Sequence, residues 1–349
     1  MHTILATRGA DQLLTDVPVE RLPELAADPE WTVWVDLCAP ITDVEKSIVS
    51  DLFKFHPLAV EDCFEEREHP KIEDYGSYLY LIAHGLQAGG TAEESESVEI
   101  DAFVGKDFIV THHSAPSRSI AGTREAVLRT GMPLRKGPVA VLHAILDRQV
   151  DGMEIMLDHM EERITQIEDA VFERPESTQI EAITAFRGNI LQLRRWMSKQ
   201  REVVYRLGRR EFALVGETEA LLFRDVHDHL VRYNDLLENY REMLSSILDA
   251  YLSMSSHRLS EIMRFLAVFT AILMPLTVIT GIYGMNFDLM PELRHPRGYP
   301  GVLMVMLLIA AGIMFYFRRK GWLGRPPPLP PPRPTEPPPP RSTASHRRS

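Results

Sequence analysis

Three consecutive residues, Gly284, Met285 and Asn286, follow an uncharged apolar run at residues 265–283. The asparagine side chain offers a carbonyl oxygen and two N–H donors without carrying a charge. Such a side chain can interact with a hydrated ion through the ion's water molecules, without the strong attraction of an opposite charge.

One helical face of this run carries small, hydroxylated or thioether side chains. Steps of three or four residues select the following members of the face: Asp249, Leu252, Ser256, Ser260, Met263, Ala267, Thr270, Met274, Thr277 and Gly281. Larger side chains, among them Phe265, Ile272 and Ile279, point elsewhere. The face suits a water-filled ion path, although small residues and threonine also serve as ordinary packing devices between membrane helices.

Two apolar runs must position these residues. Residues 265–283 and 299–317 are each 19 residues long and carry no charge. At about 1.5 Å of rise per residue, either run nearly crosses a hydrocarbon core of roughly 30 Å. We therefore expect a membrane protein with two transmembrane helices near its C-terminus. Because two helices enclose no interior, a conducting path requires an oligomer.

The region around this hairpin resembles the CorA family of magnesium channels. The resemblance lies in Tyr-Gly-Met-Asn at 283–286, Met-Pro-Glu-Leu at 290–293, Gly-Tyr-Pro at 298–300 and the basic close at 318–320. It implies a homopentameric funnel that conducts Mg²⁺, with Co²⁺ and Ni²⁺ as further candidate ions. It also implies that Gly284 and Met285 shape the outer mouth while Asn286 contacts the hydrated ion.

Further roles follow from this resemblance together with the helical face. The expected pore-lining residues are Met263, Leu266, Thr270, Met274, Thr277 and Gly281. The levels of Met263 and Leu266 resemble a hydrophobic gate that closes by dewetting. In the loop between the spans, Glu292 either attracts cations to the mouth or is an ordinary solvated acid.

Cytosolic Mg²⁺ holds the family's closed state, so we expect Mg²⁺ to be both substrate and regulatory ligand. Asp225 lies in a segment similar to the family's regulatory segment, and Asp249 lies at the cytosolic end of the pore face. The opposing acid should lie in residues 86–97, but this loop contains no aspartate. The substitutes available there are Glu93, Glu94 and Glu96.

Composition narrows the class of protein. The net charge of −11 over 349 residues disfavours nucleic acid as a partner and fits the attraction of cations. Cys38 and Cys63 show no paired spacing, which indicates reduced thiols in the cytosol. The sequence contains neither GxxxxGK[ST] nor GxGxxG, so we expect no enzyme and no nucleotide-driven step.

Residues 1–137 mix β-branched runs with short helical patterns, which predicts a cytosolic α/β domain. Predicted strands cover 31–37, 78–84 and 98–112, the last as two strands turning at Gly105 and Lys106, and predicted helices cover 43–53, 56–66 and 117–130. The whole chain is thus expected to be an α+β membrane protein.

Only helical patterns follow. An acidic hairpin is predicted within 138–217, with helices at 139–174 and 177–210, and between Asp147 and Glu181 it holds eleven acids against three arginines. This surface is either simply solvated or an acidic tip that concentrates divalent cations. One helix then runs from 218 to 283, as a cytosolic stalk to 264 and a pore helix beyond.

The stalk carries a stripe of apolar residues that needs partner helices from the same subunit or from neighbouring ones. The stripe residues are Leu230, Tyr233, Leu237, Tyr240, Leu244, Ile247, Tyr251 and Met254.

Charge sets the expected orientation. Residues 318–349 carry eight Lys and Arg, whereas the loop 284–298 has only Arg294 and Arg297. The positive-inside rule therefore places both termini in the cytoplasm of a multi-pass protein of the cell membrane, with the loop facing outward. The N-terminus has no continuous apolar core and does not read as a secretory signal.

The tail carries eleven prolines within residues 326–340, which predicts polyproline II structure. It is either a solubilising tail or a ligand for an SH3-like partner.

The sequence is also compatible with two rival functions. One is a zinc or other divalent cation transporter of the same superfamily. The other is a membrane-anchored scaffold whose proline-rich tail recruits partners. The histidine pairs at 112–113 and 227–229 lack an evident third ligand, and such pairs are more often surface or core residues than a zinc site.

Overall fold

The computed structural model describes residues 2–9, 12–65, 69–86, 97–173, 176–285 and 297–322. The chain divides into two compact units, Met1–Met254 and Ser255–Ser349. Helix α7, Glu217–Tyr283, contributes to both units because the boundary falls within it. The finer division into seven segments stays a prediction.

A seven-stranded sheet forms the centre of the first unit. Its strands are β1 (His2–Arg8), β2 (Gln12–Leu14), β3 (Trp31–Cys38), β4 (Lys71–Asp74), β5 (Tyr78–Leu86), β6 (Ser97–Gly105) and β7 (Phe108–His113). Their order is β2-β1-β3-β7-β6-β5-β4. Strands β3 and β7 run parallel, and the other neighbouring pairs are antiparallel.

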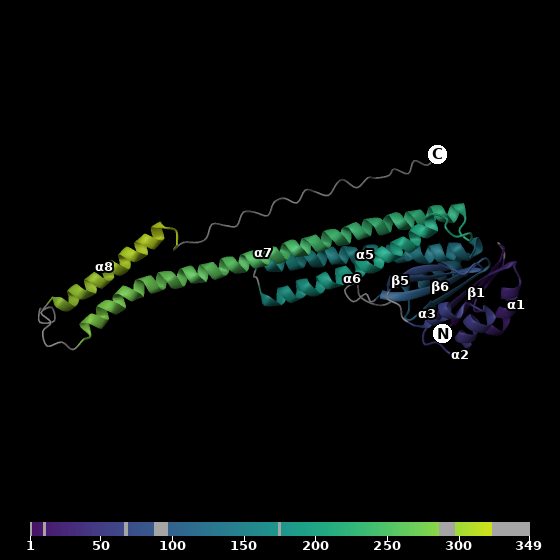
Figure 1. Ribbon diagram of the computed structural model, residues 1–349, viewed down its shortest axis with the longest axis horizontal. Coiled ribbons are helices and arrows are strands. Elements are labelled where there is room, and N and C mark those ends of the chain that lie inside the picture. Colours follow the sequence, from purple (N-terminus) through teal and green to yellow (C-terminus); the bar gives the residue numbers. More distant parts are fainter. Residues whose placement is uncertain are drawn as a thin grey trace, which may run out of the picture. The chain divides into compact units, whose positions relative to one another are not determined.

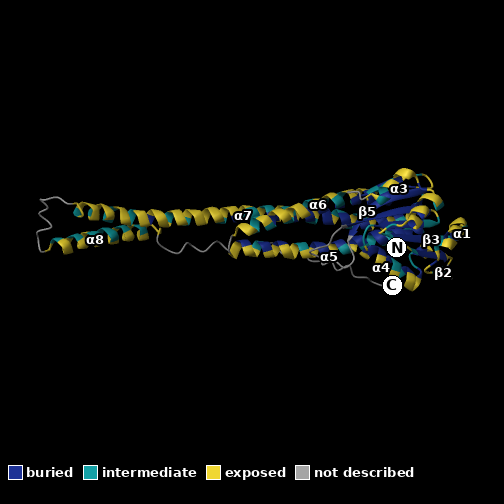
Figure 2. Ribbon diagram, turned by 90° about the horizontal axis from the view of Figure 1, so that it is seen from below, coloured by how far each residue is buried: buried dark blue, intermediate teal, exposed yellow. Residues whose placement is uncertain are grey.

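Alternation along the strands creates a hydrophobic core on each face of the sheet. In β3, Trp34 joins one core whereas Val33 and Val35 join the other, as the two-residue period of a strand requires. Figure 2 shows β3 and β5 as largely buried.

Helices cover both faces. The helices before α7 are α1 (Leu22–Ala27), α2 (Asp43–Ser47), α3 (Pro57–Phe64), α4 (Arg118–Thr130), α5 (Pro138–Glu173) and α6 (Ser177–Gly208), with short turns at Val19–Arg21, Ile48–Leu52 and Leu134–Lys136. Residues of α1 and α3 belong to the core that contains Val33, and residues of α4 and α5 belong to the core that contains Trp34.

The long helices α5, α6 and α7 lie side by side in the first unit (Figure 1). The apolar stripe predicted on the stalk is buried there from Leu230 to Tyr251. The Tyr240 hydroxyl donates to the Leu157 carbonyl of α5 at 3.3 Å, and Arg194 of α6 pairs with Glu238 at 2.5 Å. The partners of the stripe are therefore helices of the same subunit.

Most predicted elements are confirmed with small shifts at their ends. The helix predicted at 43–53 is α2 followed by a π-helical turn at Ile48–Leu52, and the one predicted at 56–66 is the shorter α3. Strands β1, β2 and β4 and helix α1 were not predicted. Each is short, between three and seven residues, so its periodicity is weak.

The second unit contains the apolar spans. Within the part of the chain that the structure describes, two helices are long and apolar enough to cross a membrane, α7 and α8 (Gly298–Arg319). The predicted spans 265–283 and 299–317 lie within them. Among the described residues from Ser255 to the end of α8, Val268 alone is buried, and Figure 2 shows α8 as mainly exposed.

Candidate functional site

The C-terminal part of α7 carries the predicted pore face. All six residues predicted to line the pore are exposed in the single chain: Met263, Leu266, Thr270, Met274, Thr277 and Gly281. At about 100° per residue they fall within an arc of about 80°. Ile272 and Ile279 lie on the opposite side of the helix and are half-buried. The six residues thus form a narrow exposed stripe along the helix.

The two threonines of this stripe use their hydroxyl hydrogens inside the helix. Thr270 Oγ1 donates to the Leu266 carbonyl at 2.8 Å, and Thr277 Oγ1 donates to the Leu273 carbonyl at 2.9 Å. Each hydroxyl oxygen therefore presents its lone pairs outward as an acceptor. Water bound to a cation directs its hydrogens away from the ion, so these oxygens suit a cation that keeps its water.

The helix continues through Pro275. Proline has no backbone N–H, so the Ala271 carbonyl receives no helical hydrogen bond from that position. This carbonyl adds a further acceptor within the apolar run.

The end of α7 is tightly turned. The Gly284 N–H donates to the Thr280 carbonyl at 2.9 Å, and the Met285 N–H donates to the Ile282 carbonyl at 3.2 Å. A Cβ at Gly284 would lie 3.0 Å from the Thr280 oxygen, closer than ordinary contact. The exit from the helix therefore favours glycine. Asn286 and Glu292 lie outside the described residues.

The two predicted regulatory aspartates are exposed side chains of α7. Asp225 stands between Phe223 and Val226, which are buried, so its own side chain faces away from the core. Asp249 is likewise exposed, two residues before the buried Tyr251. The structure does not bring Asp225 and Asp249 together, because they are 24 positions apart along one helix, about 36 Å. Glu93 and Glu94 lie outside the described residues.

Most acidic side chains of the predicted acidic hairpin are exposed. Of its eleven acids, Asp147 and Glu168 are half-buried and the other nine are exposed. Some of them make contacts within the bundle, as Glu154 does with Arg232 at 3.5 Å. The cation-concentrating role of this surface stays a prediction.

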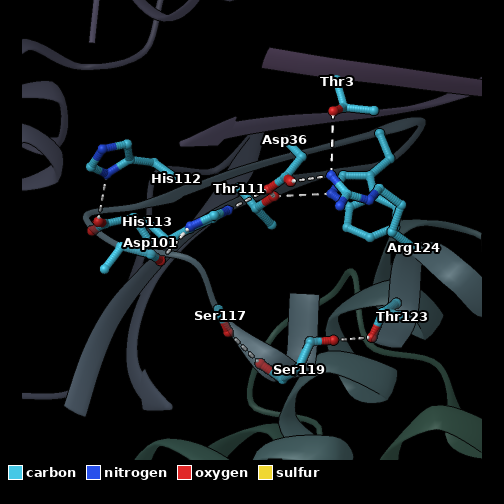
Figure 3. A network of polar contacts seen from close by, with 12 residues as sticks. Thr3, Asp36, Asp101, Thr111, His112, His113, Ser117, Ser119, Thr123 and Arg124 are labelled. Atoms are coloured by element: carbon cyan, nitrogen blue, oxygen red, sulfur yellow. Dashed lines mark hydrogen bonds and ion pairs between the residues drawn. The ribbon is translucent and has the colours of Figure 1, made fainter. Parts of the chain in front are cut away.

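The histidine pairs do not act as pairs. His112 and His113 are neighbours in β7 and therefore face opposite sides of the sheet. His113 contacts Asp36 at 3.3 Å, whereas His112 contacts Asp101 at 3.2 Å (Figure 3).

His227 and His229 are two residues apart in α7, so they do not share a helical face. Their contacts also differ, since the His227 ring lies against Tyr205 and the His229 ring against Tyr233. The two histidines of each pair therefore lie in different surroundings and do not converge on a common site.

The chain is similar to known proteins over most of its length. A family model described as CorA-like Mg²⁺ transporter protein matches residues 30–319. A Bacillus subtilis protein, YfjQ, is 34% identical over 322 residues, which cover 92% of this chain and 98% of that protein. The cobalt/magnesium transport protein CorA of Thermotoga maritima is 32% identical over 298 residues, 85% of each chain.

Solved structures agree on the fold. The complete structure of the CorA magnesium transporter from Methanocaldococcus jannaschii matches with a TM-score of 0.79 at 22% identity. The match covers 92% of this chain and 98% of that one, so it includes the sheet, the long helices and the two spans.

Proposed function

The chain belongs to the CorA family of divalent metal ion transporters, and on that premise we propose that it conducts hydrated Mg²⁺ into the cell along the membrane potential. An interior-negative potential supplies roughly 4.6 kcal/mol per 100 mV for a doubly charged ion, from about 2.3 per unit charge. This drive suffices without a nucleotide. We propose a homopentamer in the cell membrane with both termini in the cytoplasm.

The observation that carries this proposal is the stripe on α7. Thr270 and Thr277 already donate to their own helix, so they offer acceptors at two levels of the span. Met263, Leu266 and Met274 supply apolar levels between and below them. Copies of this stripe around an axis would form a path that accepts hydrogens from the ion's water and binds no bare cation tightly.

Selection would occur at the outer mouth. Gly284 and Met285 end the helix in a tight turn, which would set Asn286 at the rim. Its carboxamide oxygen accepts hydrogen bonds from ion-bound water, and Glu292 would raise the local concentration of cations. Weak capture through water also lets the ion leave.

Cytosolic Mg²⁺ would close the path. Asp225 and Asp249 are exposed and so available to ions or to a neighbouring subunit, with Glu93 and Glu94 as candidate partners. A ligand that binds the closed state more tightly shifts the population toward it. The levels of Met263 and Leu266 would then exclude water.

The test is Mg²⁺ uptake by liposomes that contain the purified chain under an imposed inside-negative potential. We expect Asn286→Ala to lower uptake by about tenfold or more, because hydrogen bonds to a charged partner are worth about 1.5–3 kcal/mol. Asn239→Ala, the same change at an exposed position of the stalk, serves as the control and should leave uptake unchanged.

The same assay separates the alternatives. Proton-coupled Zn²⁺ uptake without Mg²⁺ uptake would replace this proposal by a zinc transporter. A scaffold acting through its tail would instead tolerate Asn286→Ala and lose function when residues 326–340 are deleted. The family model for Mg²⁺ transporters favours the channel over both.

A further inference from the structure

A pocket of about 460 Å³ lies in the first unit, where α3 approaches the sheet. Its lining includes Cys63 of α3, Asp101 of β6 and His112 of β7. These side chains are 2%, 1% and 7% exposed, and one potential ligand atom from each lies within 4.8 Å of the others. Among the residues that the structure describes, no other three Cys, His, Asp or Glu side chains converge in this way.

The fold accounts for the convergence. Asp101 and His112 are direct partners in the antiparallel register of β6 and β7, so their side chains leave the same face of the sheet. Cys63 belongs to the core on that face. The ring of Phe64 lies edge-on to His112, with centroids 5.5 Å apart, and fixes the orientation of the imidazole.

Contacts within the group orient the donors without using all their lone pairs. Asp101 accepts a hydrogen bond from the Tyr80 hydroxyl at 2.6 Å. The other oxygen of Asp101 lies 3.2 Å from His112 Nδ1 (Figure 3). A carboxylate has about four acceptor positions, so Asp101 retains the capacity to bind an ion.

Two acidic residues, Glu99 and Asp101, line the pocket, with Lys46 as a cationic neighbour. A bound divalent cation would interact favourably with both carboxylates.

We propose that Cys63, Asp101 and His112 form a binding site for a thiophilic divalent cation, Zn²⁺ or Co²⁺, distinct from the ion path. Sulfur, nitrogen and oxygen donors together suit such ions, whereas Mg²⁺ favours oxygen alone. On binding, the Cys63 thiol becomes a thiolate ligand and its proton passes to solvent.

The geometry requires only a small closure. With bonds of about 2.0–2.3 Å, the ligand atoms of a tetrahedral ion lie roughly 3.3–3.7 Å apart, so an inward movement of about 1 Å closes the triad. The fourth position faces the pocket, where water or the Glu99 carboxylate can complete the shell.

Titration of the purified full-length protein with Co²⁺ tests the site, because a thiolate ligand gives a charge-transfer band that oxygen ligands do not. We expect the band in the wild type and in Cys38→Ser, a matched change at the other cysteine. We expect Cys63→Ser to abolish it and His112→Gln to weaken Co²⁺ binding by roughly 10–100-fold or more. Excess Mg²⁺ should not displace the bound Co²⁺, so the band should persist.

A second measurement leaves all three proposed ligands unchanged. In the Cys38→Ser protein, Zn²⁺ should slow alkylation of Cys63 by about tenfold or more, whereas Mg²⁺ should not. A wild type without the band, a band that depends on Cys38, or a Cys63 alkylation rate that Zn²⁺ leaves unchanged would overturn the proposal. None of these outcomes bears on Mg²⁺ uptake, which depends on the α7 stripe.

Discussion

The two parts of helix α7 differ in whether their apolar side chains are buried. Before Ser255, apolar side chains such as Leu230, Leu237 and Leu244 are fully buried against α5 and α6. After it, Leu266, Leu273 and Met274 are between 43% and 68% exposed. One continuous helix is thus part of a soluble core at one end and lacks any core at the other.

The difference follows from where the charges stand. In the first part, apolar residues recur every three or four positions between charged ones, so a single stripe suffices for packing. Residues 265–283 carry no charge on any face, which removes the distinction between a core face and a water face. Exposed apolar residues on every side require lipid or other subunits as their environment.

The largest expected effect tests the buried part. Leu237→Ala should lower the free energy of unfolding of the detergent-solubilised protein by about 2–5 kcal/mol, because it leaves a cavity in the bundle. Leu221→Ala, the same change at a side chain of α7 that is 57% exposed, should change it by less than about 0.5 kcal/mol. Denaturant unfolding followed by Trp fluorescence measures both, and equal losses would contradict the burial assigned to the stripe.

The second-largest expected effect is a dependence of the free energy of unfolding on acid pH, which arises in the first unit. Burial, with the nearby His69, lowers the pKa of His84 from 6.5 to about 4. The fold therefore favours the neutral ring, so the free energy of unfolding is highest above the unfolded pKa and falls as pH drops from 6.5 towards 4. The contribution is roughly 3 kcal/mol, at 1.36 kcal/mol per pKa unit.

The control for this prediction is His84→Phe, which keeps a ring to stack on Trp196 and removes the titration. Unfolding of wild type and variant should differ in its dependence on pH over this range, and parallel curves would refute the assignment. Residues 265–282 have no titratable side chain, so the spans should not respond.

The smallest expected effect lies in the exposed part. Thr277→Val removes one acceptor from the stripe and should lower Mg²⁺ uptake about fivefold, since one hydrogen bond is worth about 1 kcal/mol. Thr280→Val makes the same change off the stripe, at a hydroxyl that also donates within the helix. Uptake by the Thr280 variant should equal that of the wild type. If Thr280→Val lowered uptake more than Thr277→Val, the residues that line the ion path would lie on a different face of the helix from the one assigned here.

Sequence periodicity predicted most of the long elements. The great length of α7, 67 residues, and its buried stripe could be predicted because each rests on a pattern that extends over many residues. The helices that cover the stripe could not be predicted, because an apolar stripe carries no information about which helix packs against it. The packing of Tyr240 and Glu238 against α5 and α6 decided this.

Long-range pairing explains what the sequence could not show. The parallel pairing of β3 with β7 joins segments more than seventy residues apart. The group of Cys63, Asp101 and His112 depends on the register between β6 and β7 and on the position of α3 against the sheet. Neither feature produces a local pattern in the sequence. In the sequence, His112 stands out only as the neighbour of His113, which lies on the other face of the sheet. The roles of Asn286, Glu292, Glu93 and Glu94 stay predictions.

The most direct test of the central claim, that one face of the α7 span lines a water-filled ion path, is thiol accessibility at two matched positions. Thr277→Cys and Ile279→Cys would be introduced separately after Cys38 and Cys63 are replaced by serine, and Mg²⁺ uptake would be measured before and after a charged, water-soluble thiol reagent. We expect the reagent to block uptake through the Thr277 variant and to leave the Ile279 variant unaffected. Block at Ile279 with none at Thr277, or equal sensitivity of the two variants, would show that this face of α7 does not line the ion path.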